Sequence, residues 1–368
     1  MLNTYPWKRE SVIDITRDDN PQLSILSSDE FTIQSGKYAL FESNEASSDL
    51  MRPVKKVKYP VSVENIDGIF VFSNSKLRAE INSNGVLISL YDIPNDREII
   101  DLSSSGKNSR GGNQFVMFDD QPLNFPAWDT ELYSLEKYKY VEESTSVRIL
   151  ENGPLTASIK VSHALSVTSS IETIISLDAV NDLDSTSMVK FDCTVEWNEN
   201  YKFLKVEFPV TVNEEFANYE TQFGLTRRPT HFNTTWETAK FEVCSHKFAD
   251  FSDFNYGISI LNDCKYGFAT HGNLMRLSLI RAPKYPDEHA DIGTHRFKYS
   301  ILPHKGPLSS ETIRAGWEFN DRSKNLHLGV YRRNDVVSYK LNKELVSIRG
   351  DENLILKSMK LWEEREKL

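Results

Sequence analysis

Alternating apolar and polar positions predict β-strands along most of the chain. The clearest case is MVKFDCTVEW (188–197), in which one face carries Val189, Phe191, Cys193, Val195 and Trp197 and the other carries polar residues. A period of two over this length is typical of a strand with one buried face. KFLKVEFPV (202–210) repeats the pattern, and three more strands are predicted in GIFVFSN, KLRAEIN and GVLISLYDI between residues 68 and 93.

Turn residues and the scarcity of helical patterns indicate how these strands connect. Ser83-Asn84-Gly85 is a hairpin signal, because Asn and Gly tolerate positive φ. Between residues 66 and 310 no amphipathic helix of convincing length separates the strands. Parallel strands need such crossover helices, so the pattern excludes a parallel βαβ sheet and favours a large antiparallel sandwich.

The two ends of the chain follow the same pattern in shorter runs. Before residue 66, turn residues separate SVIDI, QLSIL, FTIQ, KYALFES and KYPVSVEN, which predicts a small β-sandwich. After Gly306, strands are predicted in ETIRAGWEF, NLHLGVY, VVSYKL and ELVSIRG, and a short C-terminal helix in KSMKLWEEREKL. We therefore predict an all-β chain with a small β-sandwich at 1–65, a large antiparallel supersandwich at 66–310 and a terminal β segment at 311–368.

Composition narrows the class of protein. The 368 residues fit two or three domains, and the net charge of −10 without a basic stripe argues against a nucleic-acid partner. Cys193, Cys244 and Cys264 are far apart and lack CxxC spacing, so we expect no disulfide framework and no thiolate metal site. The sequence shows neither a signal-like N-terminus nor a run of about 18 apolar residues, so we predict no membrane span and no secretion by its own signal.

The segment Arg281 to His304 concentrates ionisable side chains more than any other. It holds three histidines (His289, His295, His304) and three acids (Asp287, Glu288, Asp291). Prolines and a glycine predict an ordered loop from Lys284 to Thr294 between two strands, and such loops often carry function. The charges could equally solvate a long connection. No metal site is predicted, because the His and Asp spacing matches no known motif such as HExxH.

Two further loops carry candidate chemistry. The first, Ser109 to Tyr133, sets Asp119, Asp120 and Asp129 among Phe118, Phe125, Trp128 and Tyr133. Aromatic rings beside acids suit a sugar site, although the same residues could be core aromatics and turn-capping acids. The second loop, Gln222 to Glu242, carries Arg227, Arg228 and His231, which could form salt bridges or orient a carboxylate elsewhere. No residue is assigned as catalytic, because no nucleophile elbow or carboxylate pair is recognisable.

Several long motifs, in fixed order, resemble one enzyme family. They are NTYPWKRESVIDI, GGNQFVMFDDQPLNFPAWDTELY, ETQFGLTRRPTHFNTTWETAKFEVCSHKFADF, YGISILNDCKYGF and RAPKYPDEHADIGTHRFKYSILPH. The chain resembles the C-terminal half of glycoside hydrolase family 38 α-mannosidases, in the cytosolic and fungal vacuolar branch. The similarity runs from Asn3 to about His304 and more weakly to Lys360.

The resemblance implies a fold, and it implies that the catalytic residues lie in another domain. It implies a small sandwich, a supersandwich like that of galactose mutarotase, and a terminal β segment. Such enzymes are retaining and remove α-linked mannose from oligosaccharides. Their zinc ion and aspartate nucleophile come from an N-terminal domain that this chain is expected to lack. The expected partners are that catalytic domain, in cis or in trans, a mannose-containing oligosaccharide, and further copies of the enzyme. The expected location is the cytoplasm, or the vacuole after delivery from it.

Six residues are expected on the substrate-facing edge by motif position in this resemblance. They are Gln114 and Asp129 from the first loop, and Arg281, Asp287, Asp291 and His295 from the third. No catalytic residue and no metal ligand are expected within the chain. Two alternatives stay open, a stand-alone carbohydrate-binding module and a mutarotase-like sugar epimerase that uses His and acid side chains as base and acid.

Overall fold

The computed structural model describes residues 7–15, 30–43, 52–103 and 111–320, and the backbone of residues 330–332 and 335–337. The chain divides into two compact units, one formed by residues 1–58 and 322–368 and the other by residues 59–321. The predicted helix at 357–368 and the predicted strand ELVSIRG lie outside the described residues.

The first unit contains a small antiparallel sheet and a separate hairpin. The sheet has the order β1-β3-β2, with β4 paired to β3; the strands are β1 (Glu10–Asp14), β2 (Ile33–Gln34), β3 (Tyr38–Glu42) and β4 (Arg52–Pro53). Ile13, Ile15, Ala39 and Phe41 form its buried cluster. The hairpin pairs β25 (Val330–Arg332) with β26 (Asp335–Val337), each of which overlaps one of the segments predicted as strands.

The second unit begins with a five-stranded antiparallel meander. Its strands are β5 (Ser62–Ile66), β6 (Ile69–Ser73), β7 (Leu77–Ile81), β8 (Leu87–Asp92) and β9 (Arg97–Glu98). The turn predicted at 83–85 is present, since the Gly85 N–H donates to the Asn82 carbonyl (2.9 Å) and Gly85 has a φ of +71°. Strand β5 pairs with β6, so this part of KYPVSVEN belongs to the second unit.

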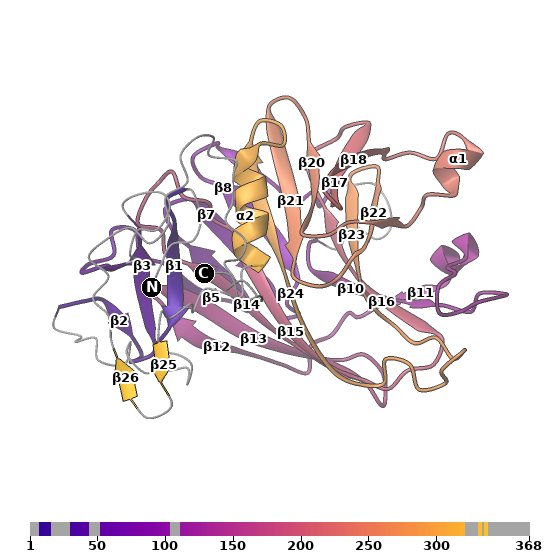
Figure 1. Ribbon diagram of the computed structural model, residues 1–368, viewed down its shortest axis with the longest axis horizontal. Helices are drawn as coiled ribbons and strands as arrows, with labels where there is room; N and C mark the ends of the chain where they lie inside the picture. Colours follow the sequence, from indigo (N-terminus) through magenta and orange to yellow (C-terminus); the bar gives the residue numbers. More distant parts are fainter. Residues whose placement is uncertain are drawn as a thin grey trace, which may run out of the picture. The chain divides into compact units, whose positions relative to one another are not determined.

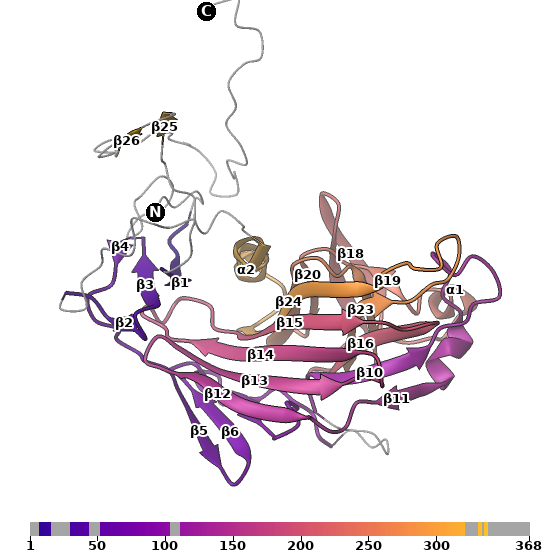
Figure 2. The same cartoon turned by 90° about the horizontal axis from the view of Figure 1, so that it is seen from below.

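Two larger antiparallel sheets form the body of the second unit (Figures 1 and 2). The nine-stranded sheet has the order β12 (Ser146–Asn152), β13 (Thr156–Ala164), β14 (Ser170–Asp178), β15 (Val189–Trp197), β24 (Gly293–Lys305), β21 (Tyr256–Asn262), β20 (Phe248–Ser252), β17 (Phe216–Thr221) and β18 (Gly224–Pro229). The six-stranded sheet has the order β11 (Tyr138–Tyr140), β10 (Gln114–Asp119), β16 (Lys202–Pro209), β23 (Leu274–Arg281), β22 (Gly267–His271) and β19 (Val243–Cys244).

The antiparallel all-β architecture is therefore confirmed. Between the five-stranded sheet and residue 309, the described chain contains only a 3₁₀ helix, η2 (Leu132–Glu136), and one helical turn, α1 (Thr235–Thr238). No helix among the described residues is long and apolar enough to cross a membrane.

The core of the second unit lies between the inner faces of the two large sheets. The Phe191 ring of β15 lies 5.0 Å from Tyr299 of β24 and 5.8 Å from Phe208 of β16, measured between centroids. The five residues that alternation places on one face of β15 are all fully buried. Burying such large side chains is the main favourable term in forming the sandwich.

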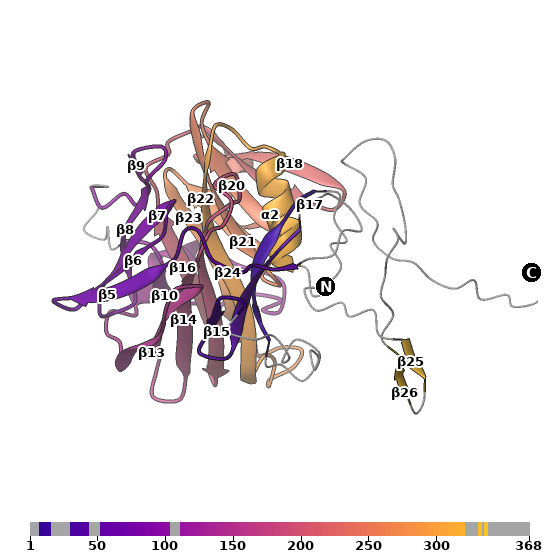
Figure 3. The same ribbon diagram turned by 90° about the vertical axis from the view of Figure 1, so that its left-hand side faces the viewer.

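The segment ETIRAGWEF is a helix, so the prediction of a strand there is wrong. Helix α2 (Ser310–Asn320) covers the outer face of β20, β21 and β24 (Figure 3), where Ala315 packs against Phe248, Leu261 and Leu302. Its buried residues Thr312, Ala315 and Gly316 are spaced three and four apart, which is helical rather than strand periodicity. A Cβ on Gly316 would lie 2.9 Å from the Phe248 ring, so the small residue permits the close approach.

The loops singled out in the sequence gather at one end of the second unit. Figures 1 and 2 show the β10–β11 connection, α1 and the β23–β24 connection at the same end. The ordered loop predicted from Lys284 to Thr294 does connect two strands, β23 and β24.

Replacing Phe191 by alanine should lower the free energy of unfolding of the second unit by about 3–5 kcal/mol, because a cavity would remain between the sheets. The matched control is Phe254→Ala, since Phe254 is 86% exposed in the turn before β21 and should change stability by less than about 0.5 kcal/mol. Urea unfolding monitored by circular dichroism measures both. Equal losses in the two variants would contradict the sandwich core.

Candidate functional site

Arg281 joins two of the three candidate loops. It is the last residue of β23, and its guanidinium binds the Asp120 carboxylate through two hydrogen bonds, Nε to Oδ2 at 2.7 Å and Nη2 to Oδ1 at 3.0 Å. Nη2 also donates to the Asp129 carbonyl oxygen at 2.7 Å. Asp120 is buried, and a bidentate Arg–carboxylate pair fixes orientation as well as distance. The start of the third loop therefore holds the first loop in place.

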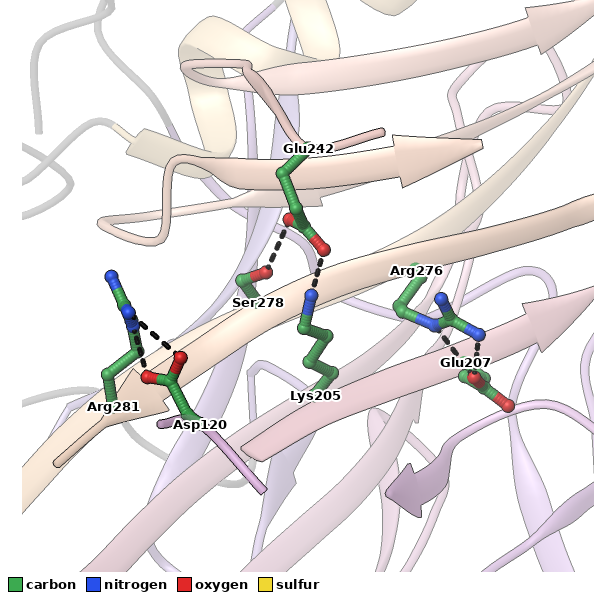
Figure 4. A network of polar contacts seen from close by, with 7 residues as sticks. All are labelled: Asp120, Lys205, Glu207, Glu242, Arg276, Ser278 and Arg281. Atoms are coloured by element: carbon green, nitrogen blue, oxygen red, sulfur yellow. Dashed lines mark hydrogen bonds and ion pairs between the residues drawn. The ribbon is translucent and has the colours of Figure 1, made fainter. Parts of the chain in front are cut away.

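This ion pair is one of three on the same face of the six-stranded sheet (Figure 4). In the second, Lys205 Nζ binds Glu242, whose other carboxylate oxygen accepts from the Ser278 hydroxyl at 3.1 Å. In the third, Arg276 Nε donates to Glu207 at 2.7 Å. We call these three pairs the ion-pair row. It lies on the face turned away from the nine-stranded sheet, since the alternate residue Phe208 packs into the core.

Strand register explains how the row is built. Opposite residues share a face, and Phe203 lies opposite Arg281, Lys205 opposite Ser278, and Glu207 opposite Arg276. A bulge between Leu204 and Lys205 allows this arrangement. Strict alternation along β23 would have put position 281 on the opposite face from positions 278 and 276.

Two aromatic rings lie among the three cations of the row. The Lys205 ammonium lies 4.2 Å from the Phe203 ring centroid and 5.3 Å from that of Phe118. The guanidinium carbon of Arg281 lies 5.2 Å from Phe203, and that of Arg276 lies 5.2 Å from Phe118. The attraction between a cation and the face of an aromatic ring offsets part of the free energy that the cation loses when it leaves water.

Lys205 is the most buried cation of the row, with 1% of its side chain exposed, compared with 18% for Arg276 and for Arg281. Burial, followed by the nearby Arg276, holds the pKa of Lys205 well below its ordinary value. The pKa of Tyr140 is raised, because its hydroxyl is partly buried and donates to Glu207 (3.3 Å).

The first loop makes a tight turn at Phe125 to Asp129, and the last residue of this turn contacts Arg281. The N–H groups of Trp128 and Asp129 both donate to the Phe125 carbonyl, at 3.1 and 2.9 Å. Phe125 has a φ of +49°, which is rare for a bulky residue. The Tyr133 hydroxyl donates to the Gln121 carbonyl at 2.6 Å and closes the base of the loop.

Asp287 and Asp291 lie on the loop between β23 and β24, and His295 lies at the start of β24. An Asp287 carboxylate oxygen accepts from the His289 N–H at 2.9 Å, and His295 Nε2 lies 2.8 Å from the Asp291 carbonyl oxygen. Both carboxylates are exposed. These contacts order the loop and leave acidic groups facing solvent, where they can accept hydrogen bonds from hydroxyl groups.

Gln114 lies apart from the other five predicted residues. It is opposite Glu207, so it shares the face of the ion-pair row but lies at the end away from Arg281. Its amide is buried and donates to the carbonyl oxygens of Phe115 (3.1 Å) and Val141 (2.8 Å). In this structure Gln114 anchors the edge strand β11.

The basic residues of the second loop form local contacts. Arg227 packs over the Phe216 ring at 4.2 Å, and His231 lies between Glu215 (3.5 Å) and Glu237 (3.3 Å). Glu237 also completes a capping box with Thr234 at the start of α1.

A groove of about 720 Å³ lies beside strand β11. Residues 137–145, together with Ala164 to Val167, contribute much of its lining, and none of the six predicted residues does. Asp119 at its edge accepts hydrogen bonds from Lys137 and Lys202, which lower the pKa of that carboxyl. The groove therefore touches the first loop only through Met117 and Asp119, before the turn that Arg281 holds.

Metal binding finds no support in the part of the chain that the structure describes. No group of three His, Cys, Asp or Glu side chains there is arranged to hold a metal ion. Sequence reasoning missed the row residues Lys205, Glu207, Glu242 and Arg276. The alternation of Lys205 and Glu207 with apolar residues signalled a strand, but a polar face is ordinarily assumed to meet water.

Comparisons with known proteins agree on one family. The model for the glycosyl hydrolases family 38 C-terminal domain matches residues 72–289. The alpha-mannosidase of Saccharomyces cerevisiae is 48% identical over 83% of this chain and 28% of its own length. Alpha-mannosidase 2C1 of Homo sapiens is 36% identical over 87% of this chain and 29% of its own. The chain thus spans less than a third of these curated relatives.

A solved structure shares the fold. The crystal structure of an alpha-mannosidase from Enterococcus faecalis V583 matches 87% of this chain and 44% of that one, with a TM-score of 0.61 and 14% identity.

Replacing Arg281 by alanine should lower the free energy of unfolding by about 3–5 kcal/mol, because the buried Asp120 carboxylate would lose its counter-ion. Asp287→Ala is the control, since this exposed carboxylate accepts from a nearby backbone N–H, and it should change stability by less than about 0.5 kcal/mol. Chemical denaturation compares the two. A loss of under 1 kcal/mol, roughly the value of a surface pair, would contradict the structural role of Arg281.

The depressed pKa of Lys205 predicts a pH dependence of stability. Between its folded-state pKa and its unfolded value, the unfolded chain binds the extra proton, so stability rises with pH across that window. Relative to Lys205→Met, the wild type should gain stability as pH rises from neutral toward 10. Lys139→Met, on the exposed surface of β11, is the control and should show no such trend. A pH-independent difference for Lys205→Met would show that Lys205 stays protonated in the fold.

Proposed function

The chain belongs to the glycosyl hydrolases family 38 C-terminal domain, whose model covers more than half of it, and on this basis we propose that it is the non-catalytic β-rich part of an α-mannosidase. In this proposal it supplies scaffold and one wall of the mannose site. The nucleophile and the zinc ion lie in the part of the enzyme that this chain does not span. The described residues do not form a zinc site, so no chemical step is assigned to the metal here.

The observation that carries the proposal is the link made by Arg281. One guanidinium, anchored on the buried Asp120, also holds the backbone at Asp129. Two of the loops that carry the resemblance to the family are thereby fixed to one rigid sheet. Rigid loops at one end of a sandwich can present a surface of constant shape to a substrate held by another domain.

The chemistry of this surface suits a sugar. Asp129, Asp287 and Asp291 present exposed carboxylates, which accept hydrogen bonds from hydroxyl groups. His295 lies beside Asp291 and supplies the remaining polar group of the wall. In the proposed enzyme these groups bind and orient the mannose-containing oligosaccharide, while the other domain performs the displacement.

The same proposal includes the assembly and the location of the enzyme. The partner of this chain is the catalytic α-mannosidase domain, in cis or in trans, and the complete enzyme is a homo-oligomer. It acts in the cytoplasm or, after delivery, in the vacuole. Support for a catalytic partner comes from the relatives, which are named alpha-mannosidases and are more than three times as long as the segment they share with this chain.

A carbohydrate-binding module is the second candidate. The observation in its favour is the exposed ring pair of Phe125 and Trp128, with centroids 5.3 Å apart. A module of this kind would bind sugar without a catalytic partner. The two candidates differ in whether the chain supports turnover.

A hybrid enzyme tests the proposal. The segment of the S. cerevisiae alpha-mannosidase that aligns with this chain is replaced by the chain, and hydrolysis of 4-nitrophenyl α-mannoside is measured. The hybrid should be active, and the same enzyme without the segment should not. In the hybrid, Asp287→Ala with Asp291→Ala should lower kcat/KM by about 10- to 100-fold through lost positioning.

The control substitution in the hybrid is Asp192→Ala. Asp192 lies on the outer face of β15 and pairs with Lys298, away from the loop end, so activity should not change. A folded but inactive hybrid, or equal activity without the segment, would contradict the proposed function.

A further inference from the structure

The turn of the first loop presents two large aromatic rings to solvent. Phe125 is 53% exposed and Trp128 is 61% exposed. Their rings are stacked, with centroids 5.3 Å apart and an angle of 18° between planes. One face of each ring is taken up by the other ring. The large exposed area of Trp128 therefore belongs mainly to its edge and its outer face.

The backbone holds these rings in a fixed position. The Phe125 carbonyl accepts from the N–H groups of both Trp128 and Asp129, and Phe125 adopts a positive φ. A bulky residue keeps this unfavourable conformation only where its surroundings enforce it. Arg281 provides such enforcement, because it holds the Asp129 carbonyl and is itself anchored on Asp120. The ring pair is thus tied to the buried ion-pair row.

We propose that Trp128, backed by Phe125, is a stacking platform for a pyranose ring of an α-linked manno-oligosaccharide. The platform would hold a sugar unit other than the mannose that is cleaved. The inference rests on the proposed function and deepens it, because it names a part of the substrate and the residue that binds it. A pyranose offers a patch of C–H groups, whose partial positive charge complements the negative face of an indole.

The polar neighbours favour a sugar over an apolar protein surface. Asp129, directly after Trp128, is exposed and can accept hydrogen bonds from sugar hydroxyls. The core of a protein–protein interface is depleted of charged residues. A sugar, by contrast, offers C–H groups to aromatic rings and hydroxyl groups to carboxylates. The rigid turn also suits a weak ligand, because little ordering entropy is lost on binding.

The chain offers a matched control for the platform. Trp236, in α1, is 78% exposed and so equally available to solvent. It lies in the second loop, whereas the contacts of Arg281 hold the turn of the first loop. If any exposed indole bound the sugar non-specifically, replacing either tryptophan would therefore weaken binding. If the platform is specific, only the replacement of Trp128 would do so.

Saturation-transfer NMR of the full chain with α-mannotriose tests the inference. The wild type and Trp236→Ala should transfer saturation to the mannose C–H protons, and Trp128→Ala should weaken the affinity by about tenfold. Arg281→Lys keeps both rings and the charge but loses the bidentate contact, and it should also weaken binding. The absence of transfer to the wild type would overturn the platform. So would equal affinities for the Trp128→Ala and Trp236→Ala variants.

The hybrid enzyme separates this inference from the proposed function. There, Trp128→Ala should raise KM for α-mannotriose about tenfold and leave 4-nitrophenyl α-mannoside, which has no second sugar, unchanged. An equal loss on both substrates would assign the rings to a protein contact and overturn the platform. A hybrid without any activity would count against the proposed function alone, and the NMR measurement would still decide the platform.

Discussion

The bidentate pair between Arg281 and Asp120 is the constraint on which the loop end of this molecule depends. It joins the end of β23 to the segment that follows β10, and through the Asp129 carbonyl it fixes the turn that carries Trp128. Because Asp120 is buried, breaking the pair would leave an uncompensated charge and would cost more than breaking a surface salt bridge. The shape of the proposed sugar wall follows from this contact.

The two faces of the six-stranded sheet, one of which carries the ion-pair row, are buried in different environments. The inner face of the six-stranded sheet packs Phe208 against the nine-stranded sheet, whereas the other face buries charged side chains under loops. Buried pairs often stabilise less than well-packed apolar residues would. The Arg281 pair instead fixes geometry, because the oriented guanidinium donates to one particular backbone atom of the first loop, the Asp129 carbonyl oxygen. That specificity is what a preformed binding wall needs.

Most strands could be predicted from the sequence, but their pairing and register could not. Alternation identified β15 and its buried face, and Asn84 with Gly85 identified a hairpin. The same strand interpretation failed at α2, where small residues spaced three and four apart indicate a helix. The row was missed because it depends on register and on a bulge beside Lys205, neither of which periodicity reveals. Arg281, Asp129, Asp287, Asp291 and His295 were singled out by motif position, and their role in binding substrate remains a proposal.

The chain belongs to the family and shares the fold of a solved relative, and its role of positioning sugar for chemistry performed elsewhere is our proposal. The most direct measurement is the release of 4-nitrophenol from 4-nitrophenyl α-mannoside by the purified chain, with zinc titrated from none to excess. A non-catalytic β-rich part predicts no release above the buffer rate at any zinc concentration. A saturable, zinc-dependent rate from the chain alone would contradict the account.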